Sequence, residues 1–325
     1  MRKLIVLGVL AGLVALAALT AIPAGAKPPG TNGRILFGRF DPAFGDTIVY
    51  TANPDGSQEQ QLLPGPLQCA HWSPDGSLIA TCGFPDGSAA VIINPDTGSY
   101  RELFSSDPSL FLVCPVWSPD AKRLACGQWN QPADPSRNGV YSIRSSDGGG
   151  VERITSNPGG SDEAGDYSPD GRRLVFARSD QNGDPIGLFV VNVNGTGLKQ
   201  IMPAGTLVSG GVDWSPQGNQ IVFSQHVTPD VRSSIWIVHA DGTGLHEIPV
   251  QAQPVCGGAY SDPTSQGCFT PRWSPDGTEI IFARGTSGDQ DSNIYTVDVD
   301  GTGLTQVTHG GTDQQPDWGT HPAIG

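Results

Sequence analysis

A five-residue motif recurs along the chain and constrains the fold more than any other feature. The motif has an aromatic residue, then Ser-Pro, then usually Asp-Gly, and its copies are separated by 45, 50, 47, 59 and 45 residues. A repeat of this length corresponds to one four-stranded propeller blade, which takes about 40–45 residues plus loop insertions. The copies begin at Trp72, Trp117, Tyr167, Trp214 and Trp273, and a shortened copy occupies Pro316–Gly319.

Each repeat contains the same order of short apolar segments and turns. An apolar strand follows the motif, as in Leu174–Phe176, and a second strand such as Leu188–Val191 follows a polar loop. β-branched and aromatic residues favour strands, and the Asp-Gly or Asn-Gly pair that comes next favours a tight hairpin. The pattern predicts an all-β chain with four strands in each repeat.

The ends of the chain predict how the ring closes. Residues 33–56 supply three strands of a blade but lack the strand that should precede them. The segment Gln315–Trp318 at the other end supplies one strand and nothing after it. We therefore expect six blades, with the first blade closed by the C-terminal strand, which leaves no open sheet edge.

The repeated aspartates have a structural explanation. Proline presets the backbone for a turn, aspartate bonds the neighbouring backbone, and glycine adopts the left-handed corner. Because every such aspartate has the same Pro-Asp context, we interpret them as turn residues and not as ligands. The aromatic residue before the turn is expected to fill the wedge between two blades.

These residues together resemble a known family. The pattern of Trp273–Phe282, followed by Ile294–Val297 and Asp300-Gly301, looks like the PD40, or TolB-like, propeller repeat, a relative of WD40. The resemblance covers residues 33–320 and implies a fold more than a function, because propellers include binding proteins, lyases and hydrolase appendages. TolB proteins carry an α/β domain before the propeller. We expect none here, and therefore no role in the Tol envelope system.

The N-terminus resembles an export signal. Arg2 and Lys3 precede an apolar run, Leu4–Ile22, and the Ala24-Gly25-Ala26 sequence offers a cleavage site. We expect residues 1–26 to be a signal peptide, 27–32 a short linker, 33–320 the propeller and 321–325 a tail. An uncleaved membrane anchor at residues 4–22 is the alternative. Export would place the protein in the periplasm, the cell envelope or the medium.

The cysteines fit an oxidising compartment. An even number of cysteines after a signal peptide favours disulfides, although six cysteines allow 15 pairings. The sequence spacing favours pairs within a repeat, but a bond between repeats, such as Cys69 with Cys114, and a zinc cluster stay open as alternatives. The three close pairs are Cys69 with Cys82, Cys114 with Cys126, and Cys256 with Cys268.

Loop lengths indicate which end of the propeller binds a partner. The Ser-Pro-Asp-Gly and Asp-Gly turns share one end and are short, whereas the loops at the other end vary in length. Long loops on a rigid scaffold tend to carry binding residues. We expect the binding site on this long-loop face, with Asp162, Glu163 and Asp313 as a ring at the channel mouth, although solvated charge would explain these three as well. The other candidates are Trp129, Arg137, His226, Arg232 and Tyr260.

The sequence favours a binding protein over an enzyme. It contains none of the G-x-S-x-G, H-E-x-x-H or P-loop motifs. The net charge of −14 disfavours nucleic acid and anionic membranes as partners. Asp289–Asn293 resembles the start of a calcium loop, but Ile294 occupies the position of its glycine, so we expect no cofactor.

We expect a monomeric, non-enzymatic scaffold that binds a protein or glycan of the cell envelope. The alternative is a polysaccharide lyase or hydrolase with a site at the channel mouth, in which His226 and Arg137 would be recruited.

Overall fold

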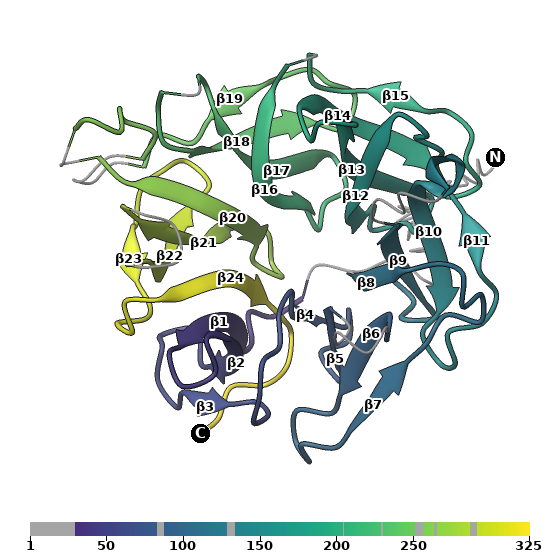
Figure 1. The fold of residues 1–325 in the computed structure, drawn as a ribbon. Coiled ribbons are helices and arrows are strands. Elements are labelled where there is room, and N and C mark those ends of the chain that lie inside the picture. Colours follow the sequence, from purple (N-terminus) through teal and green to yellow (C-terminus); the bar gives the residue numbers. More distant parts are fainter. Residues whose placement is uncertain are drawn as a thin grey trace, which may run out of the picture.

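Six four-stranded antiparallel sheets surround a central channel in the computed structural model (Figure 1). The structure describes residues 30–82, 88–128, 134–203, 205–228, 230–250, 256–262, 265–286 and 291–325. Among these residues the only helical segment is one 3-10 turn, η1 (Pro135–Arg137). The predicted all-β, six-bladed propeller is therefore confirmed.

Each blade is one sheet. Its four strands are given below in order from the innermost, beside the channel, to the outermost, at the rim. Blade 1 has the order β24 (Asp313–Trp318), β1 (Ile35–Asp41), β2 (Asp46–Ala52), β3 (Gln60–Gln61), and blade 2 has β4 (His71–Trp72), β5 (Ile79–Cys82), β6 (Ala90–Ile93), β7 (Tyr100–Leu103). Blade 3 comprises β8 (Leu112–Trp117), β9 (Arg123–Gln128), β10 (Gly139–Arg144), β11 (Glu152–Arg153), and blade 4 comprises β12 (Gly160–Tyr167), β13 (Arg173–Asp180), β14 (Pro185–Asn192), β15 (Lys199–Gln200). Blade 5 comprises β16 (Leu207–Trp214), β17 (Gln220–His226), β18 (Ser234–His239), β19 (His246–Glu247), and blade 6 comprises β20 (Gly267–Trp273), β21 (Glu279–Gly285), β22 (Asn293–Asp298), β23 (Thr305–Gln306).

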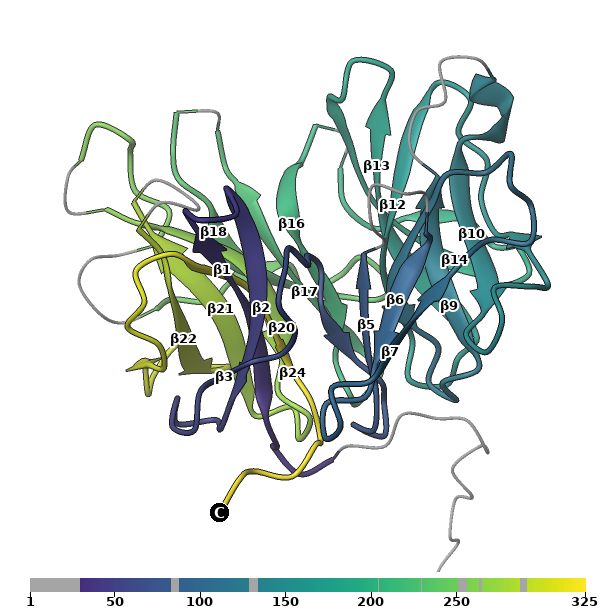
Figure 2. The ribbon, with the colours of Figure 1, turned by 60° about the horizontal axis from the view of Figure 1, so that its bottom comes forward.

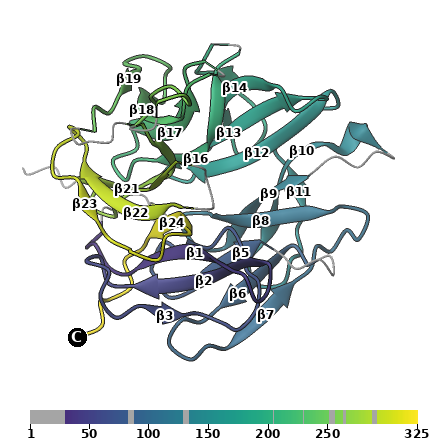
Figure 3. The same cartoon turned by 60° about the vertical axis from the view of Figure 1, so that its left-hand side comes forward.

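The C-terminal strand closes the first blade, as predicted. Strand β24 pairs antiparallel with β1, so that Ile35 lies opposite Trp318 and Arg39 lies opposite Asp313. Figures 1 and 3 show the yellow C-terminal strand beside the purple first strand. The Trp318 indole Nε1 donates a hydrogen bond to the Gly33 carbonyl oxygen at 2.9 Å. The two ends of the chain therefore form one sheet.

The repeated aromatic residue packs between neighbouring blades. The buried apolar residues form six clusters, and each cluster joins side chains of two adjacent blades around one copy of the motif aromatic. Trp214, for example, is 1% exposed and lies among residues of blades 4 and 5. The core is thus divided into six wedges, which explains why the same aromatic position recurs in every repeat. The six residues are Trp72, Trp117, Tyr167, Trp214, Trp273 and Trp318.

The Ser-Pro-Asp-Gly segment is a turn stabilised by its own side chains. The Ser73 hydroxyl donates to Asp75 Oδ1 at 2.6 Å and accepts from the Leu78 backbone N–H at 2.9 Å. Gly76 closes the turn with a φ of +71°, a conformation that favours glycine. Burial alone would raise the pKa of Asp75, but hydrogen bonds from Ser73 and Ser77 outweigh burial and hold the pKa below its usual value.

The three disulfides connect the cysteines that are close in sequence. Cys69 pairs with Cys82, Cys114 with Cys126, and Cys256 with Cys268. The first two join an inner strand or its approach to the second strand of the same blade, across the Ser-Pro-Asp turn. The third ties the insertion after β19 to β20. Each disulfide therefore joins cysteines 12 or 13 residues apart in sequence, the first two within one blade.

The two ends of the propeller differ in the length of their loops. The short turns and the C-terminus share one end, and the loops that join the second and third strands project from the other (Figure 2). Strands β1 and β2 extend further than expected, to Asp41 and from Asp46, so the loop between them is short. Residues 1–29, which include the expected signal peptide, lie outside the described residues. No helix in the described part of the chain is long and apolar enough to cross a membrane.

Replacement of Trp318 by alanine should destabilise the closed ring. Trp318 is 6% exposed, and removal of a buried tryptophan side chain costs about 3–5 kcal/mol. We expect a loss of that size in the free energy of unfolding, measured by urea denaturation. Phe44→Ala is the control, because Phe44 is 55% exposed and surface changes alter stability by about 0.5 kcal/mol at most. A loss below about 1 kcal/mol for Trp318→Ala would show that β24 is dispensable.

The turn aspartates should make the fold sensitive to acid. The pKa values of Asp75, Asp120, Asp170 and Asp276 are all held below the usual value by serine hydroxyls and backbone N–H groups. Their contribution to stability is complete above the unfolded-state pKa of about 3.9 and is lost as the pH falls through the lower folded-state values.

We expect the fourfold Asp→Asn variant at these positions to lose less stability between pH 5 and pH 2 than the parent does, measured by urea denaturation at each pH. The amide oxygen can accept the same hydrogen bonds but does not titrate. A double variant of the exposed Glu102 and Glu247 to glutamine is the control. An unchanged acid slope in the fourfold variant would assign acid sensitivity to other carboxylates.

Candidate functional site

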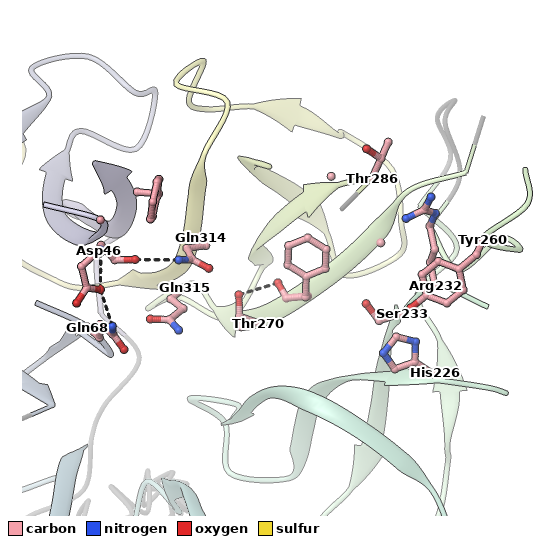
Figure 4. Close-up of a pocket in the computed structure, with 16 residues that line it drawn as sticks. Asp46, Gln68, His226, Arg232, Ser233, Tyr260, Thr270, Thr286, Gln314 and Gln315 are labelled. Atoms are coloured by element: carbon pink, nitrogen blue, oxygen red, sulfur yellow. Dashed lines mark hydrogen bonds between the residues drawn. The ribbon is translucent and has the colours of Figure 1, made fainter. Parts of the chain in front are cut away.

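A cavity of about 630 Å³ opens on the long-loop face. It lies over blades 5, 6 and 1, and the described residues that line it come from β1, β2, β17, β20, β21 and β24 and from the loops beside them (Figure 4). Its volume is within the range of about 300–1,000 Å³ that is typical of ligand pockets. This cavity lies on the face that carries the variable loops.

One end of the cavity holds three of the predicted residues. The Arg232 guanidinium lies 5.0 Å from the centre of the Tyr260 ring, and the His226 and Tyr260 rings stack with centroids 6.5 Å apart. Backbone hydrogen bonds join the two loops that carry them, from Arg232 N to Gly258 O at 2.9 Å and from Tyr260 N to Asp230 O at 3.3 Å. The insertion after β19 therefore brings Tyr260 to residues that precede β18.

Hydrogen bonds fix the orientation of this group. Arg232 Nε donates to the Ser265 hydroxyl at 3.2 Å. His226 Nδ1 lies 2.8 Å from the Val231 carbonyl oxygen. Since a carbonyl oxygen only accepts, Nδ1 carries the proton, and in the neutral imidazole Nε2 is an acceptor. The end of the cavity thus offers a cation, an aromatic edge and one imidazole nitrogen.

The opposite end of the cavity is lined by residues of blades 1 and 2 and presents acceptor oxygens. Asp46 Oδ1 accepts hydrogen bonds from the Thr47 N–H at 2.7 Å and from Gln68 Nε2 at 2.7 Å. Gln314 Nε2 donates to the Thr47 hydroxyl at 3.0 Å. Each amide uses one of its two N–H donors in these bonds. Asp46 Oδ2 and the Oε1 atoms of Gln68 and Gln314 are therefore the acceptors that stay available at this end.

The middle of the cavity combines aromatic rings with polar side chains. Phe40 and Phe269 line the wall on either side of β24. Gln315 Oε1 accepts a hydrogen bond from the Cys69 N–H at 3.2 Å, so its Nε2 is the group that is free to donate. The Thr270 hydroxyl donates to the Phe269 carbonyl oxygen at 2.8 Å and keeps its lone pairs. This mixture suits a ligand with both apolar and hydroxylated surfaces.

The central channel is a second, smaller cavity of about 270 Å³, lined by residues of all six blades. Glu163 and Arg272 face it from β12 and β20. Desolvation by the channel walls raises the pKa of Glu163, and the positive charge of Arg272 only partly opposes this rise. Arg272 donates to the Val212 carbonyl oxygen at 3.0 Å and lies 3.3 Å from His71 Nε2. Of the three acids expected at the channel mouth, Glu163 is the one that faces the channel.

The other two acids are not where the sequence placed them. Asp162 and Asp313 are fully buried, and each forms a bidentate ion pair with the arginine opposite it on the adjacent strand. Asp162 accepts from Arg178 at 2.7 Å and 2.7 Å, and Asp313 accepts from Arg39 at 2.6 Å and 3.1 Å. The expectation of a carboxylate ring is therefore wrong for these two, because strand alternation turns them away from the channel.

A further set of acids joins neighbouring blades and was not foreseen. Asp166 accepts a hydrogen bond from the Trp214 N–H at 3.2 Å, and Asp213 accepts one from the Trp273 N–H at 2.7 Å. Asp317 and Trp72 repeat the contact at the closure, at 2.7 Å. Each acid directly precedes the motif aromatic of its own blade. An aspartate directly before the motif aromatic is therefore the sequence signal from which these inter-blade acids could have been predicted.

The remaining candidates lie elsewhere or cannot be placed. Arg137 lies in η1, where it forms an ion pair with Asp107 at 2.7 Å and is not among the residues that line the cavity. Trp129, Asp289 and Gln290 lie outside the described residues. Within the described residues, no group of three or more His, Cys, Asp or Glu side chains could hold a metal ion.

Comparison with known proteins connects this geometry to a family. The family model PD40, the TolB β-propeller domain, matches residues 45–253. An uncharacterized protein of Agrobacterium fabrum is 33% identical over 133 residues, which are 40% of this chain and 41% of the relative. The Tol-Pal system protein TolB of Bordetella pertussis is 27% identical over 142 residues, or 42% of this chain and 30% of that protein. These matches span less than half the length of the curated relatives.

Solved structures agree on the fold. TolB from Acinetobacter baumannii has a TM-score of 0.64 at 21% identity, and the match covers 88% of this chain and 66% of that one. A structure described as an oligogalacturonate lyase in complex with manganese has a TM-score of 0.55 at 15% identity, covering 85% and 74%. Neighbours with such different activities share the propeller alone. The family match over residues 45–253 and the closed ring of six blades show that the chain belongs to the TolB β-propeller (PD40) family.

Proposed function

We propose that this chain is an extracytoplasmic, non-catalytic propeller that binds a protein or glycan of the cell envelope in the cavity of its long-loop face. One observation carries the proposal: His226 at the end of β17, Arg232 in the loop after it and Tyr260 in the insertion after β19 meet at one end of the larger cavity. Aromatic and arginine side chains in a preformed hollow are typical anchors of a binding site.

Two further observations support an extracytoplasmic location. Three disulfides between cysteines close in sequence suit an oxidising environment outside the cytoplasm. The apolar run at residues 4–22 and the small residues at 24–26 suit export with cleavage after residue 26. The Bordetella relatives belong by name to the Tol-Pal system, which is consistent with a partner in the envelope.

Tyr260 should be an anchor of the partner. Tyrosine hot spots cost about 2 kcal/mol or more when truncated, so Tyr260→Ala should reduce capture of the partner at least about 10-fold. The measurement is quantitative capture from envelope extract on the immobilised protein, with and without chemical crosslinking. Tyr100→Ala is a matched control, because Tyr100 is 57% exposed, Tyr260 is 52% exposed, and Tyr100 lies at the turn end of blade 2.

Equal capture by the Tyr260→Ala and Tyr100→Ala variants would remove the long-loop face as the binding surface. Turnover of uronic-acid oligomers by the parent protein, measured in the same preparations, would replace the binding proposal by the enzymatic alternative.

A further inference from the structure

The two ends of the long-loop cavity carry different polar groups: a guanidinium at one end, and a carboxylate with two amides at the other. In Figure 4, Arg232 and Tyr260 lie at one end, and Asp46, Gln68 and Gln314 lie at the other. Resting on the proposed function, we infer that the ligand is an acidic oligosaccharide, with the carboxylate of a uronic-acid unit on Arg232 and the hydroxyls of a neighbouring unit on the acceptor end.

Arg232 is suited to a carboxylate from outside. It is the only arginine or lysine among the described residues that line the cavity. Its Nε bonds Ser265 and its plane lies over Tyr260, so the guanidinium is held in place without an acidic partner among the described residues. Its two Nη groups are then available as the paired donors that match a carboxylate.

The contrast with other arginines supports this assignment. Arg39 and Arg178 are bonded to buried aspartates, and Arg137 is paired with Asp107. In a chain with a net charge of −14, acidic partners for arginine are plentiful. A cation that lines a cavity and makes no such pair is therefore in a position to bind an anion of the ligand.

The acceptor end is suited to hydroxyl groups. Gln68 and Gln314 each donate one amide N–H to a neighbour, so each keeps Oε1 and a second N–H, and Asp46 presents Oδ2. A sugar hydroxyl can donate to one of these oxygens and accept from a neighbouring donor, such as Gln315 Nε2. Only one carboxylate lines this end, and it already accepts two hydrogen bonds, which makes a neutral donor a better match than an ammonium group.

The cavity walls are poorly suited to an extended peptide. One common mode of peptide binding adds the peptide as a strand to an exposed sheet edge. Here the inner strands β20 and β24 are interrupted by residues in the left-handed region, Thr270 with a φ of +52° and Gln315 with a φ of +49°. Register shifts accompany both positions. A bulged strand does not continue its hydrogen-bond ladder, so side chains dominate the recognition surface.

The test compares an acidic sugar with its neutral ester. Trigalacturonate, its methyl ester and an acetylated tripeptide with a free C-terminal carboxylate are titrated into the full chain by isothermal calorimetry at pH 7. We expect trigalacturonate to bind at least 10-fold more tightly than the ester, since hydrogen bonds to charged groups are the stronger ones. The preference should decrease as salt is added.

Arg232→Gln should abolish the preference for the acid and leave binding of the ester unchanged. Arg172→Gln, which removes the same charge from an exposed residue beside the turn Asp170-Gly171, should bind like the parent. Unfolding curves of both variants check that each is folded. The inference is overturned if the ester binds as well as the acid, if the tripeptide binds more tightly than trigalacturonate, or if none of the three binds.

This outcome is separable from the fate of the proposed function. If Tyr260→Ala still reduces capture of an envelope partner while trigalacturonate does not bind, the long-loop face is the binding surface and the acidic sugar is wrong. If trigalacturonate binds and depends on Arg232 while capture does not depend on Tyr260, the cavity is a glycan site and envelope capture uses another surface.

Discussion

Closure of the ring by β24 is the constraint on which the other features depend. A propeller blade cannot bury its aromatic wedge alone, because the wedge is completed by the next blade. The pairing of β1 with β24 gives the first blade its inner strand and gives Trp318 a place between blades 6 and 1. The hydrogen bond from the Trp72 N–H to Asp317 then joins blade 1 to blade 2. The same Asp-to-tryptophan N–H contact thus occurs beside the blade that closes the ring and between later pairs of consecutive blades.

Closure also explains why the candidate site could be only half predicted. His226, Arg232 and Tyr260 were identified because they lie in loops that are long for the repeat, and long loops are visible in a sequence. Asp46 and Gln68 lie in short segments near the N-terminus. Nothing local connects them to Gln314, 246 or more residues away, until the ring is closed. That half of the cavity is a product of tertiary structure.

The fold was more predictable than the roles of individual acids. In each blade the repeated motif determines the turn, the strand that follows it and the aromatic residue between blades, and it does so through contacts between residues close in sequence. The six similar segments therefore all predict the same blade structure. The ion pairs of Asp162 and Asp313 depend instead on which face of a strand each acid takes and on which arginine lies opposite. The arginine of each pair stands two residues after a phenylalanine, in Phe37–Arg39 and in Phe176–Arg178, but the same spacing in Phe282–Arg284 lies opposite Cys268 and not an acid. The pairing partner therefore becomes visible only in the folded sheet, where the ion pairs make Asp162 and Asp313 poor ligand candidates.

The position of the cavity over the seam couples binding to closure. Its described lining includes Thr47 from the N-terminal blade, Gln314 from the C-terminal strand and Arg232 from blade 5. A ligand that contacts all three binds only the closed ring, and a ligand that binds only one state stabilises that state. The strand that completes the fold therefore also completes the site, and occupancy of the cavity would hold together the two ends of the chain. A propeller closed by a terminal strand can in this way combine a binding surface with the seam that joins its two ends.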